Sequence, residues 1–170
     1  MCAVNWFDAV AFCEWLTAHE RVSGAIRKET YRLPTDKEWT AAAGTGEFPW
    51  GNRWPPTAED ANIAGREARN EETGAKWEVL TAHTDLYPRT SPVGSFAPNA
   101  LGVFDLGGNL WEWCAEPFPG KADSRIIRGG SWFSFEKEFL RTQYRGDGRA
   151  DSRGTVRGFR VVLALPAAGQ

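Results

Sequence analysis

The chain has 170 residues, of which 42% are apolar and 25% charged, so it can bury the core of one domain. Its net charge of −2 and pI near 5.8 exclude a general attraction to nucleic acid or to anionic membranes. No apolar run is long enough for a transmembrane helix, and the N-terminus lacks the layout of a signal peptide. We therefore expect one cytoplasmic domain spanning residues 1–170.

Two helices are predicted near the N-terminus. Asn5 can cap the first helix, whose apolar positions recur at helical spacing. These positions are Trp6, Ala9, Val10, Cys13 and Leu16. The second helix follows Pro34, where Thr35 and Glu38 form a capping box, and Gly44 ends it.

Residues 46–100 are rich in glycine and proline, which interrupt any long periodicity. So long a stretch with little regular structure is expected to be functional, or to be held by something other than an apolar core. After residue 100, short apolar runs at 103–104, 125–128 and 158–165 predict strands. The expected fold class is α+β, with two helices, long loops and then a small twisted antiparallel sheet.

The three cysteines are Cys2, Cys13 and Cys114, and no C-x-x-C spacing occurs among them. This excludes a zinc knuckle and a thioredoxin-like redox pair. Cys13 lies on the apolar stripe of the first helix and Cys114 follows a Trp-Glu-Trp run, so both are expected to be buried small apolar side chains. Reduced cysteines agree with a cytosolic location.

Five ordered sequence blocks carry the most specific signal. They are V-N-W-F-D-A-V-A-F-C-E-W-L at 4–16, Y-R-L-P-T-D-K-E-W at 31–39, G-G-N-L-W-E-W at 107–113, R-G-G-S-W at 128–132 and R-G-F-R-V-V at 157–162. Together they resemble the formylglycine-generating, or sulfatase-modifying-factor, family, a calcium-binding variant of the C-type lectin fold. The resemblance covers nearly the whole chain. The given sequence begins almost at the V-x-W-x-D-A helix, so we expect the strand region that usually precedes this helix to be absent or replaced by a partner.

The resemblance implies that the long loops hold one or two calcium ions. By spacing alone, the carboxylates of these loops would be ordinary solvated side chains. Calcium takes about six to eight oxygen ligands from carboxylates, amides and carbonyls. The first implied set combines the side chains of Asn62 and Asp85 with the carbonyls of Ile63 and Tyr87. The second combines the side chains of Asp105 and Glu112 with the carbonyls of Gly108 and Leu110.

The R-G-G-S-W and G-F-R blocks have a mostly structural interpretation. Trp132 and Phe159 are expected to anchor the core, while Arg128 and Arg160 hold carboxylates or carbonyls in bidentate fashion. The segment between the blocks mixes aromatic residues with arginines, which is typical of binding hot spots. In the alternative interpretation the aromatics are core and the arginines form a salt-bridged rim.

We expect this C-terminal surface to bind a protein or a small molecule. The candidate contact residues are Trp132, Phe133, Phe135, Glu136, Tyr144, Arg145, Asp147, Arg149 and Arg153. Phe139 is the aromatic residue of the segment that most resembles a core position, because apolar alternation resumes around it.

The catalytic groups implied by the enzymes of the family are missing. Copper-dependent members bind metal through two thiolates, but here Ser134 stands at the first position and Lys137 or Phe139 near the second. Iron-dependent sulfoxide synthases use three histidines, whereas this chain has only His19 and His83. No G-x-S-x-G elbow supports serine hydrolysis. We therefore expect neither copper nor iron in the isolated chain.

A third branch, the variable proteins of diversity-generating retroelements, uses the same fold as a display scaffold. Its diversified stretch runs from about R-G-G-S-W to G-F-R. We therefore predict a non-catalytic binding domain on a calcium-stabilised scaffold. The alternative is an oxidoreductase of the formylglycine-generating or sulfoxide synthase type whose metal site a partner completes. The sequence leaves the oligomeric state open.

Overall fold

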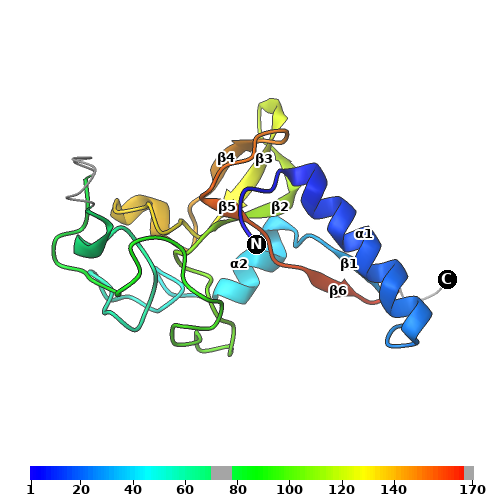
Figure 1. The fold of residues 1–170 in the computed structure, drawn as a ribbon, viewed down its shortest axis with the longest axis horizontal. Helices are drawn as coiled ribbons and strands as arrows, with labels where there is room; N and C mark the ends of the chain where they lie inside the picture. Colours follow the sequence, from blue (N-terminus) through cyan, green and yellow to red (C-terminus); the bar gives the residue numbers. More distant parts are fainter. Residues whose placement is uncertain (70–77, 167–170) are drawn as a thin grey trace.

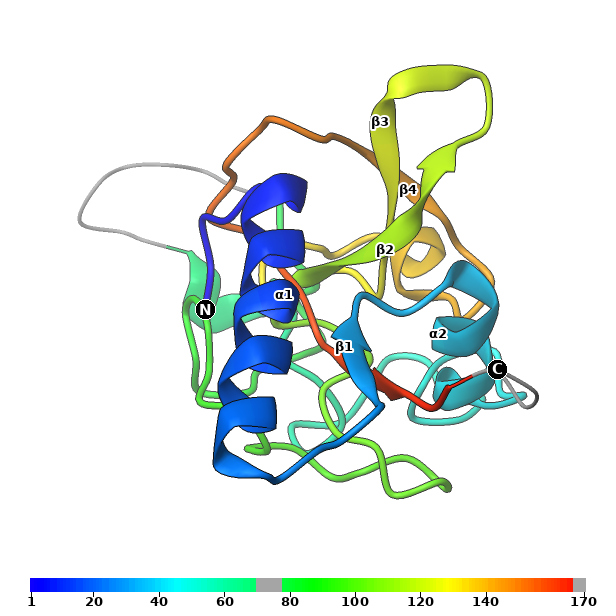
Figure 2. The ribbon, with the colours of Figure 1, turned by 90° about the vertical axis from the view of Figure 1, so that its right-hand side faces the viewer.

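The computed structural model describes residues 1–69 and 78–166. In this part of the chain, Figure 1 shows helices and short sheets gathered at one end and long loops at the other. Figure 2 shows α1 lying across the sheets. Within the described residues no helix is long and apolar enough to cross a membrane.

Helix α1 (Trp6–Ser23) begins at the expected cap. The Asn5 side chain accepts a hydrogen bond from the Asp8 amide at 2.8 Å, and the Asp8 carboxylate accepts one from the Asn5 amide at 3.0 Å. Ala9 and Cys13 are buried on the predicted face, and Gly24 ends the helix in the left-handed conformation. The prediction of this helix is confirmed.

Helix α2 (Asp36–Ala43) is also confirmed, with the capping box between Thr35 and Glu38 and its end at Gly44. It follows a short strand, β1 (Thr30–Arg32), that the sequence patterns did not predict. Trp39 is only 1% exposed and anchors α2 against the sheet.

A four-stranded sheet has the order β4-β3-β2-β5. Strands β2 (Trp111–Phe118) and β3 (Lys121–Arg128) form an antiparallel hairpin, and β4 (Gly146–Arg149) extends it on the β3 side. Strand β5 (Arg157–Gly158) runs parallel to β2. The α+β class and the strand at 125–128 are thus confirmed, and the parallel pairing of β5 makes the sheet mixed.

The expected strand at 158–165 is divided between β5 and β6 (Val162–Ala164), and β6 pairs with β1 in a separate antiparallel sheet. The prediction of a strand at 103–104 is wrong. The Asn99 side chain accepts a hydrogen bond from the Val103 amide at 3.0 Å, and the Val103 carbonyl accepts one from the Asn99 amide at 3.0 Å. These local bonds hold the segment in a turn instead of a ladder.

The apolar core lies between α1, α2 and the sheets. One buried cluster joins α1 to β2 and β3 through Cys13, Trp113 and Ile127, and a second joins α2 to the same strands. A smaller cluster around Phe48 and Ile63 lies in the loop region, beside the short helices η1 (Arg66–Ala68) and η2 (Lys137–Leu140). The core therefore fixes one end of the molecule more extensively than the other.

Candidate functional site: two loop clusters and the C-terminal segment

The structure brings together all four residues of the first implied calcium set. Asp85 is 3% exposed, and its two carboxylate oxygens accept hydrogen bonds from the Ile63 and Tyr87 amides, each at 2.9 Å. Asn62 is fully buried, and its Nδ2 donates to the Arg89 carbonyl at 2.7 Å. The Asn62 Oδ1 is buried and has no hydrogen-bond partner. This orphaned oxygen fits a cation ligand, because an unpaired buried acceptor is otherwise costly.

His83 lies beside this set and was missed by the sequence patterns. Its Nδ1 is 3.2 Å from the Pro56 carbonyl and its Nε2 is 3.2 Å from Asp85 Oδ2, so both ring nitrogens face acceptors. Burial lowers the pKa of His83, but these two hydrogen bonds outweigh it and raise the pKa above its ordinary value. The H-x-D spacing of His83 and Asp85 is the signal that could have revealed this contact.

The second set lies directly against the first. The Asn109 amide donates to the Asn62 carbonyl at 2.7 Å, and Gly108 forms a parallel bridge with Asn62. Gly108 has φ +80°, and a Cβ there would lie 2.0 Å from the Asn62 carbonyl oxygen. Only glycine allows this approach of the two loops.

Asp105 and Glu112 provide the side chains of the second set. Asp105 Oδ2 accepts a hydrogen bond from the Gly94 amide at 2.7 Å, while Oδ1 is buried and has no partner. Glu112 projects from β2 and is 8% exposed. Each of the two sets therefore contains one buried, unpaired oxygen, and the residues fit calcium on that observation. Leu110, which lies between Asp105 and Glu112 in the sequence, lines the adjoining cavity.

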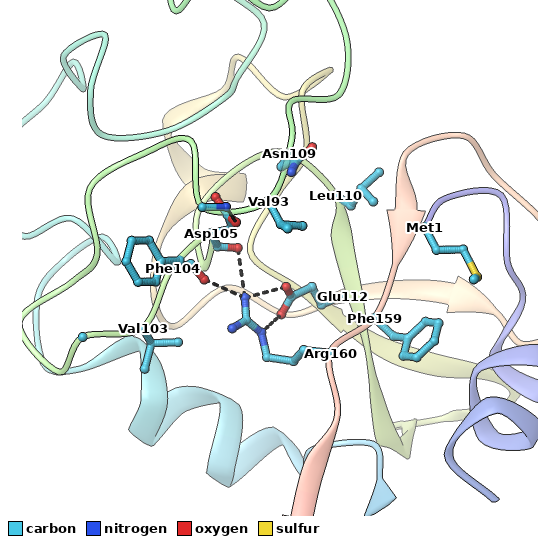
Figure 3. Close-up of a pocket in the computed structure, with 12 residues that line it drawn as sticks. Met1, Val93, Val103, Phe104, Asp105, Asn109, Leu110, Glu112, Phe159 and Arg160 are labelled. Atoms are coloured by element: carbon cyan, nitrogen blue, oxygen red, sulfur yellow. Dashed lines mark hydrogen bonds and ion pairs between the residues drawn. The ribbon is translucent and has the colours of Figure 1, made fainter. Parts of the chain in front are cut away.

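Arg160 occupies one side of Glu112. Its Nε and Nη2 donate to the two Glu112 oxygens at 2.6 and 2.7 Å, and Nη2 also reaches the Phe104 and Asp105 carbonyls (Figure 3). Burial lowers the pKa of Arg160, but the charge of Glu112 outweighs it and raises that pKa. The expected bidentate role of Arg160 is confirmed, and a cation at Asp105 would share Glu112 with it.

Among the described residues, no group of three or more His, Cys, Asp or Glu side chains is arranged to hold a metal ion. Each set offers at most two carboxylates and depends on amide and carbonyl oxygens for the rest. Such a donor set suits a hard cation such as calcium and does not suit copper or zinc.

The first half of the C-terminal segment packs against the loops. Trp132 is 5% exposed, as expected of a core anchor, whereas Phe133 is 45% exposed. The Ser134 carbonyl accepts a hydrogen bond from the Ala64 amide at 3.0 Å, which ties the segment to the loop that carries Asn62 and Ile63. Phe135 and Glu136 follow and are half-buried.

The second half contains an aromatic cluster formed by Trp111, Phe139 and Tyr144. Their ring centroids are 5.1 to 6.3 Å apart, and all three side chains are half-buried. Phe139 thus packs on its neighbours without being fully buried. Trp111 was not among the candidate contacts, and its place in the W-E-W block beside Glu112 is the signal that could have found it.

Four of the charged candidate residues, Arg145, Asp147, Arg149 and Arg153, form ion pairs within the chain. Their partners lie in different parts of the fold, and of the four only Arg145 directly follows a member of the aromatic cluster, Tyr144. The pairs are Arg145 with Asp36 at 2.8 Å, Asp147 with Lys121 at 2.8 Å, Arg149 with Asp151 at 2.9 Å and Arg153 with Asp8 at 2.8 Å.

Arg128 is fully buried and joins three elements. It donates to Asp36 on α2 and to the Thr142 carbonyl at 2.5 Å, and its guanidinium lies 4.5 Å from the Trp39 ring centroid. The structural role expected of this arginine is confirmed. Asp36 also forms an ion pair with Arg145, so the buried Arg128 and one exposed candidate residue share the same carboxylate.

The position expected of a first catalytic thiol holds a buried serine. Ser134 is 4% exposed, and its Oγ accepts a hydrogen bond from the Ser131 amide at 3.1 Å. Cys13 and Cys114 are buried as expected, and burial raises the pKa of both thiols. A raised pKa reduces the thiolate fraction, so neither has the character of a reactive cysteine.

A cavity of about 560 Å³ opens beside Glu112 and Arg160. Its walls are largely apolar, and Figure 3 shows them around the ion pair. The apolar lining residues are Met1, Val93, Val103, Phe104, Leu110 and Phe159. The volume is within the ordinary range for small-ligand sites.

Comparison with known proteins shows related sequences along almost the whole chain. The chain is 31% identical to a formylglycine-generating enzyme of Thermomonospora curvata over 94% of this chain and 54% of that protein. It is 33% identical to the inactive C-alpha-formylglycine-generating enzyme 2 of Mus musculus over 90% of this chain and 41% of that protein. The chain thus spans about half the length of these relatives.

The solved structure of Treponema denticola variable protein 1 has the same fold. It superposes with a TM-score of 0.68 over 95% of this chain and 69% of that one, at 21% identity. Residues 1–165 match the domain family described as sulfatase-modifying factor enzyme 1-like. The five sequence blocks and this match have one explanation: the chain belongs to the sulfatase-modifying-factor, or FGE-sulfatase, family.

Proposed function

We propose that this chain is a non-catalytic domain that binds a ligand or another protein on a calcium-stabilised scaffold. The observation that carries this proposal is Ser134, a buried hydrogen-bonded serine where the oxidases of the family would need a thiolate. That a relative at 33% identity is named as inactive supports the same conclusion. The likeness to a variable protein supports the narrower proposal of a retroelement variable protein.

Calcium is proposed at both loop sets, as one or two ions per chain. The support is the pair of buried unpaired oxygens, Asn62 Oδ1 and Asp105 Oδ1, one in each set. Elemental analysis of the purified chain tests this directly. Asn62→Ala should remove the first ion and Asp105→Asn the second, while Asp123→Asn on the exposed end of β3 should remove neither. A chain free of calcium in all four forms contradicts the proposal.

The binding surface is proposed around the cluster of Trp111, Phe139 and Tyr144, extended by Arg145 and by the exposed Phe133. Half-exposed aromatics give contact area, and a neighbouring guanidinium gives planar donors. The double variant Tyr144→Ala, Arg145→Ala should weaken binding by at least ~2 kcal/mol and change the melting temperature little. Loss of folding in this variant, with binding abolished instead by changes elsewhere, would place the surface outside the segment.

The alternative is an oxidoreductase whose metal site a partner completes, and the 31% identity to a formylglycine-generating enzyme favours it. The two proposals separate on one measurement with the purified chain. A non-catalytic domain consumes no oxygen with a cysteine peptide in the presence of copper or iron. Copper or iron near one per chain, together with formation of a peptide aldehyde, would establish the enzyme instead.

We propose a cytoplasmic location on the three free cysteines, since exposed Cys2 remains reduced more readily in a reducing compartment. Fractionation of the native host with an antibody against the chain tests this. Recovery from a secreted or periplasmic fraction contradicts it.

A further inference from the structure

The aromatic cluster lies where three elements of the fold meet. Trp111 begins β2, Phe139 belongs to η2, and Tyr144 lies two residues before β4. The Trp111 ring lies against β4, since a Cβ added at Gly146 would be 3.4 Å from it. All three rings are half-buried, so the fold holds them in place while part of each stays open to a ligand.

Cations of this chain occupy other aromatic rings. The Arg157 guanidinium lies 5.5 Å from the ring centroid of Trp113, two positions further along β2. Arg145, which directly follows Tyr144, points its Nε and Nη2 at Asp36 on α2. Among the described residues, no lysine or arginine lies over any ring of the cluster. These ring faces are therefore open to a cation from outside the chain.

Three carboxylates give the surroundings of the cluster a negative charge. Burial raises the pKa of Tyr144, and the charges of Asp147, Glu138 and Glu136 raise it further. The first two carboxylates are paired with basic side chains of the chain. Glu136 is half-buried and forms no ion pair within residues 1–69 and 78–166. One carboxylate beside the cluster thus lacks a counter-charge.

We propose that the ligand of this surface presents an arginine side chain, which lies on the rings of Trp111 and Tyr144 and forms an ion pair with Glu136. This inference rests on the proposed binding surface and adds the chemical class of its ligand. A guanidinium is planar, so it stacks on aromatic rings, and its fork of N–H donors matches a carboxylate. An anionic group would meet three carboxylates, and a neutral group would leave Glu136 unpaired.

The arginine fits a partner protein better than a free small molecule. The side chains of Glu138 and Asp147 are 65% and 38% exposed, so they extend the acidic surface around the cluster. Exposed charges at the rim of an interface steer a larger partner of opposite charge. Half-exposed aromatic rings are typical of the centre of a protein–protein interface.

Two capped peptides test the class of ligand. One is Gly-Ser-Arg-Ser-Gly, and the other carries citrulline, a neutral residue of nearly the same shape, in place of the arginine. In a nuclear magnetic resonance titration the arginine peptide should shift the indole N–H signal of Trp111. It should bind about tenfold more tightly than the citrulline peptide, and high salt should reduce this ratio. Free methylguanidinium should bind more weakly than the arginine peptide.

Glu136→Gln should weaken binding of the arginine peptide about threefold and leave binding of the citrulline peptide unchanged. Glu14→Gln, on the exposed side of α1, makes the same change in net charge and should have no effect. Tyr144→Leu removes a ring face and should lower the preference for arginine, whereas Tyr144→Phe keeps the ring and should preserve it. The melting temperature of each variant reports whether the fold is intact.

Equal affinity for the two peptides, with the Trp111 signal shifted by both, overturns the arginine assignment and leaves the proposed binding surface standing. Absence of any shift at millimolar arginine peptide also overturns it, as does a preference for arginine that survives both Glu136→Gln and Tyr144→Leu. Equal binding of methylguanidinium would contradict a partner protein. The proposed function fails on a different result, the formation of a peptide aldehyde by the purified chain.

Discussion

The helix-sheet end and the loop end of this molecule are stabilised by different kinds of contact. Around α1, α2 and the hairpin, the largest buried side chains are Trp39 and Trp113, which pack on other apolar groups. In residues 46–110 the buried side chains include three polar ones that are at most 3% exposed and form hydrogen bonds mainly with backbone groups. They are Asn62, His83 and Asp85. An apolar core tolerates small shifts, whereas a buried polar cluster requires every partner in place.

This difference teaches where function can be expected. Polar loops that approach one another closely need an exact backbone path, and the proposed calcium would supply the attraction that a core would otherwise provide. The sheet end has no such need, because its apolar clusters already join the helices to the strands. Four changes should affect the two ends of the molecule to different degrees.

Gly108→Ala should be the most damaging change in the loop end. Its Cβ would lie 2.0 Å from the Asn62 carbonyl, and neither backbone can move away cheaply. We expect a loss above ~4 kcal/mol in the free energy of unfolding, measured by urea denaturation. Gly120→Ala is the matched control, since Gly120 has a similar φ of +77° and nothing within 4 Å. It should lose only the ~1–2 kcal/mol of left-handed strain.

Arg128→Met tests the buried charge in the sheet end. Removing the guanidinium leaves the Thr142 carbonyl without its donor and deprives Asp36 of one partner, which should cost about 3–5 kcal/mol. Arg149→Met serves as the control, because the Arg149–Asp151 pair is exposed. The urea denaturation curve of that control should coincide with the curve of the parent protein. A mild effect of Arg128→Met would show that the volume of the side chain at this position matters more than its charge.

Removal of the proposed calcium should destabilise the loop end only. Excess chelator should lower the melting temperature by several degrees, since each ~1 kcal/mol moves a domain of this size by roughly 2–4 °C. Hydrogen exchange should quicken at the amides of Ile63, Tyr87 and Asn109, while those of α1 and β3 remain unchanged. Uniform acceleration in both ends would mean that the ions stabilise the whole domain equally.

Glu38 should have the smallest effect. Hydrogen bonds from Arg32 and from the Thr35 amide lower its pKa from 4.5 to about 2. A carboxyl with a depressed folded-state pKa stabilises the protein above about pH 4.5 and loses that contribution as pH falls toward 2. Because the pair is 40% exposed on each side, we expect less than ~1 kcal/mol. Glu38→Gln should flatten the decline in stability over this interval, and an unchanged acid profile would argue against the assignment.

Both helices, the hairpin strand at 125–128 and the membership of the family follow from the sequence by itself. Their signals are local: a capping box joins residues three apart, and helical stripes repeat within two turns. The grouping of Asn62 with Asp85 and of Asp105 with Glu112 came from the resemblance to the family. In the structure Asp85 accepts a hydrogen bond from the Ile63 amide, next to Asn62, and Arg160 bridges the Asp105 carbonyl and the Glu112 carboxylate.

Only the tertiary structure decided how distant segments meet. The turn at Val103 replaced an expected strand because Asn99 captured its backbone. Arginines of the C-terminal segment form ion pairs with carboxylates of other elements. Arg153 pairs with Asp8 on α1 and Arg145 with Asp36 on α2. Arg160 forms an ion pair with Glu112, 48 residues away in the sequence. Strand β6, near the C-terminal end of the described residues, pairs with β1 near the N-terminus. Such contacts depend on the shape of the whole fold, which no short stretch of sequence encodes.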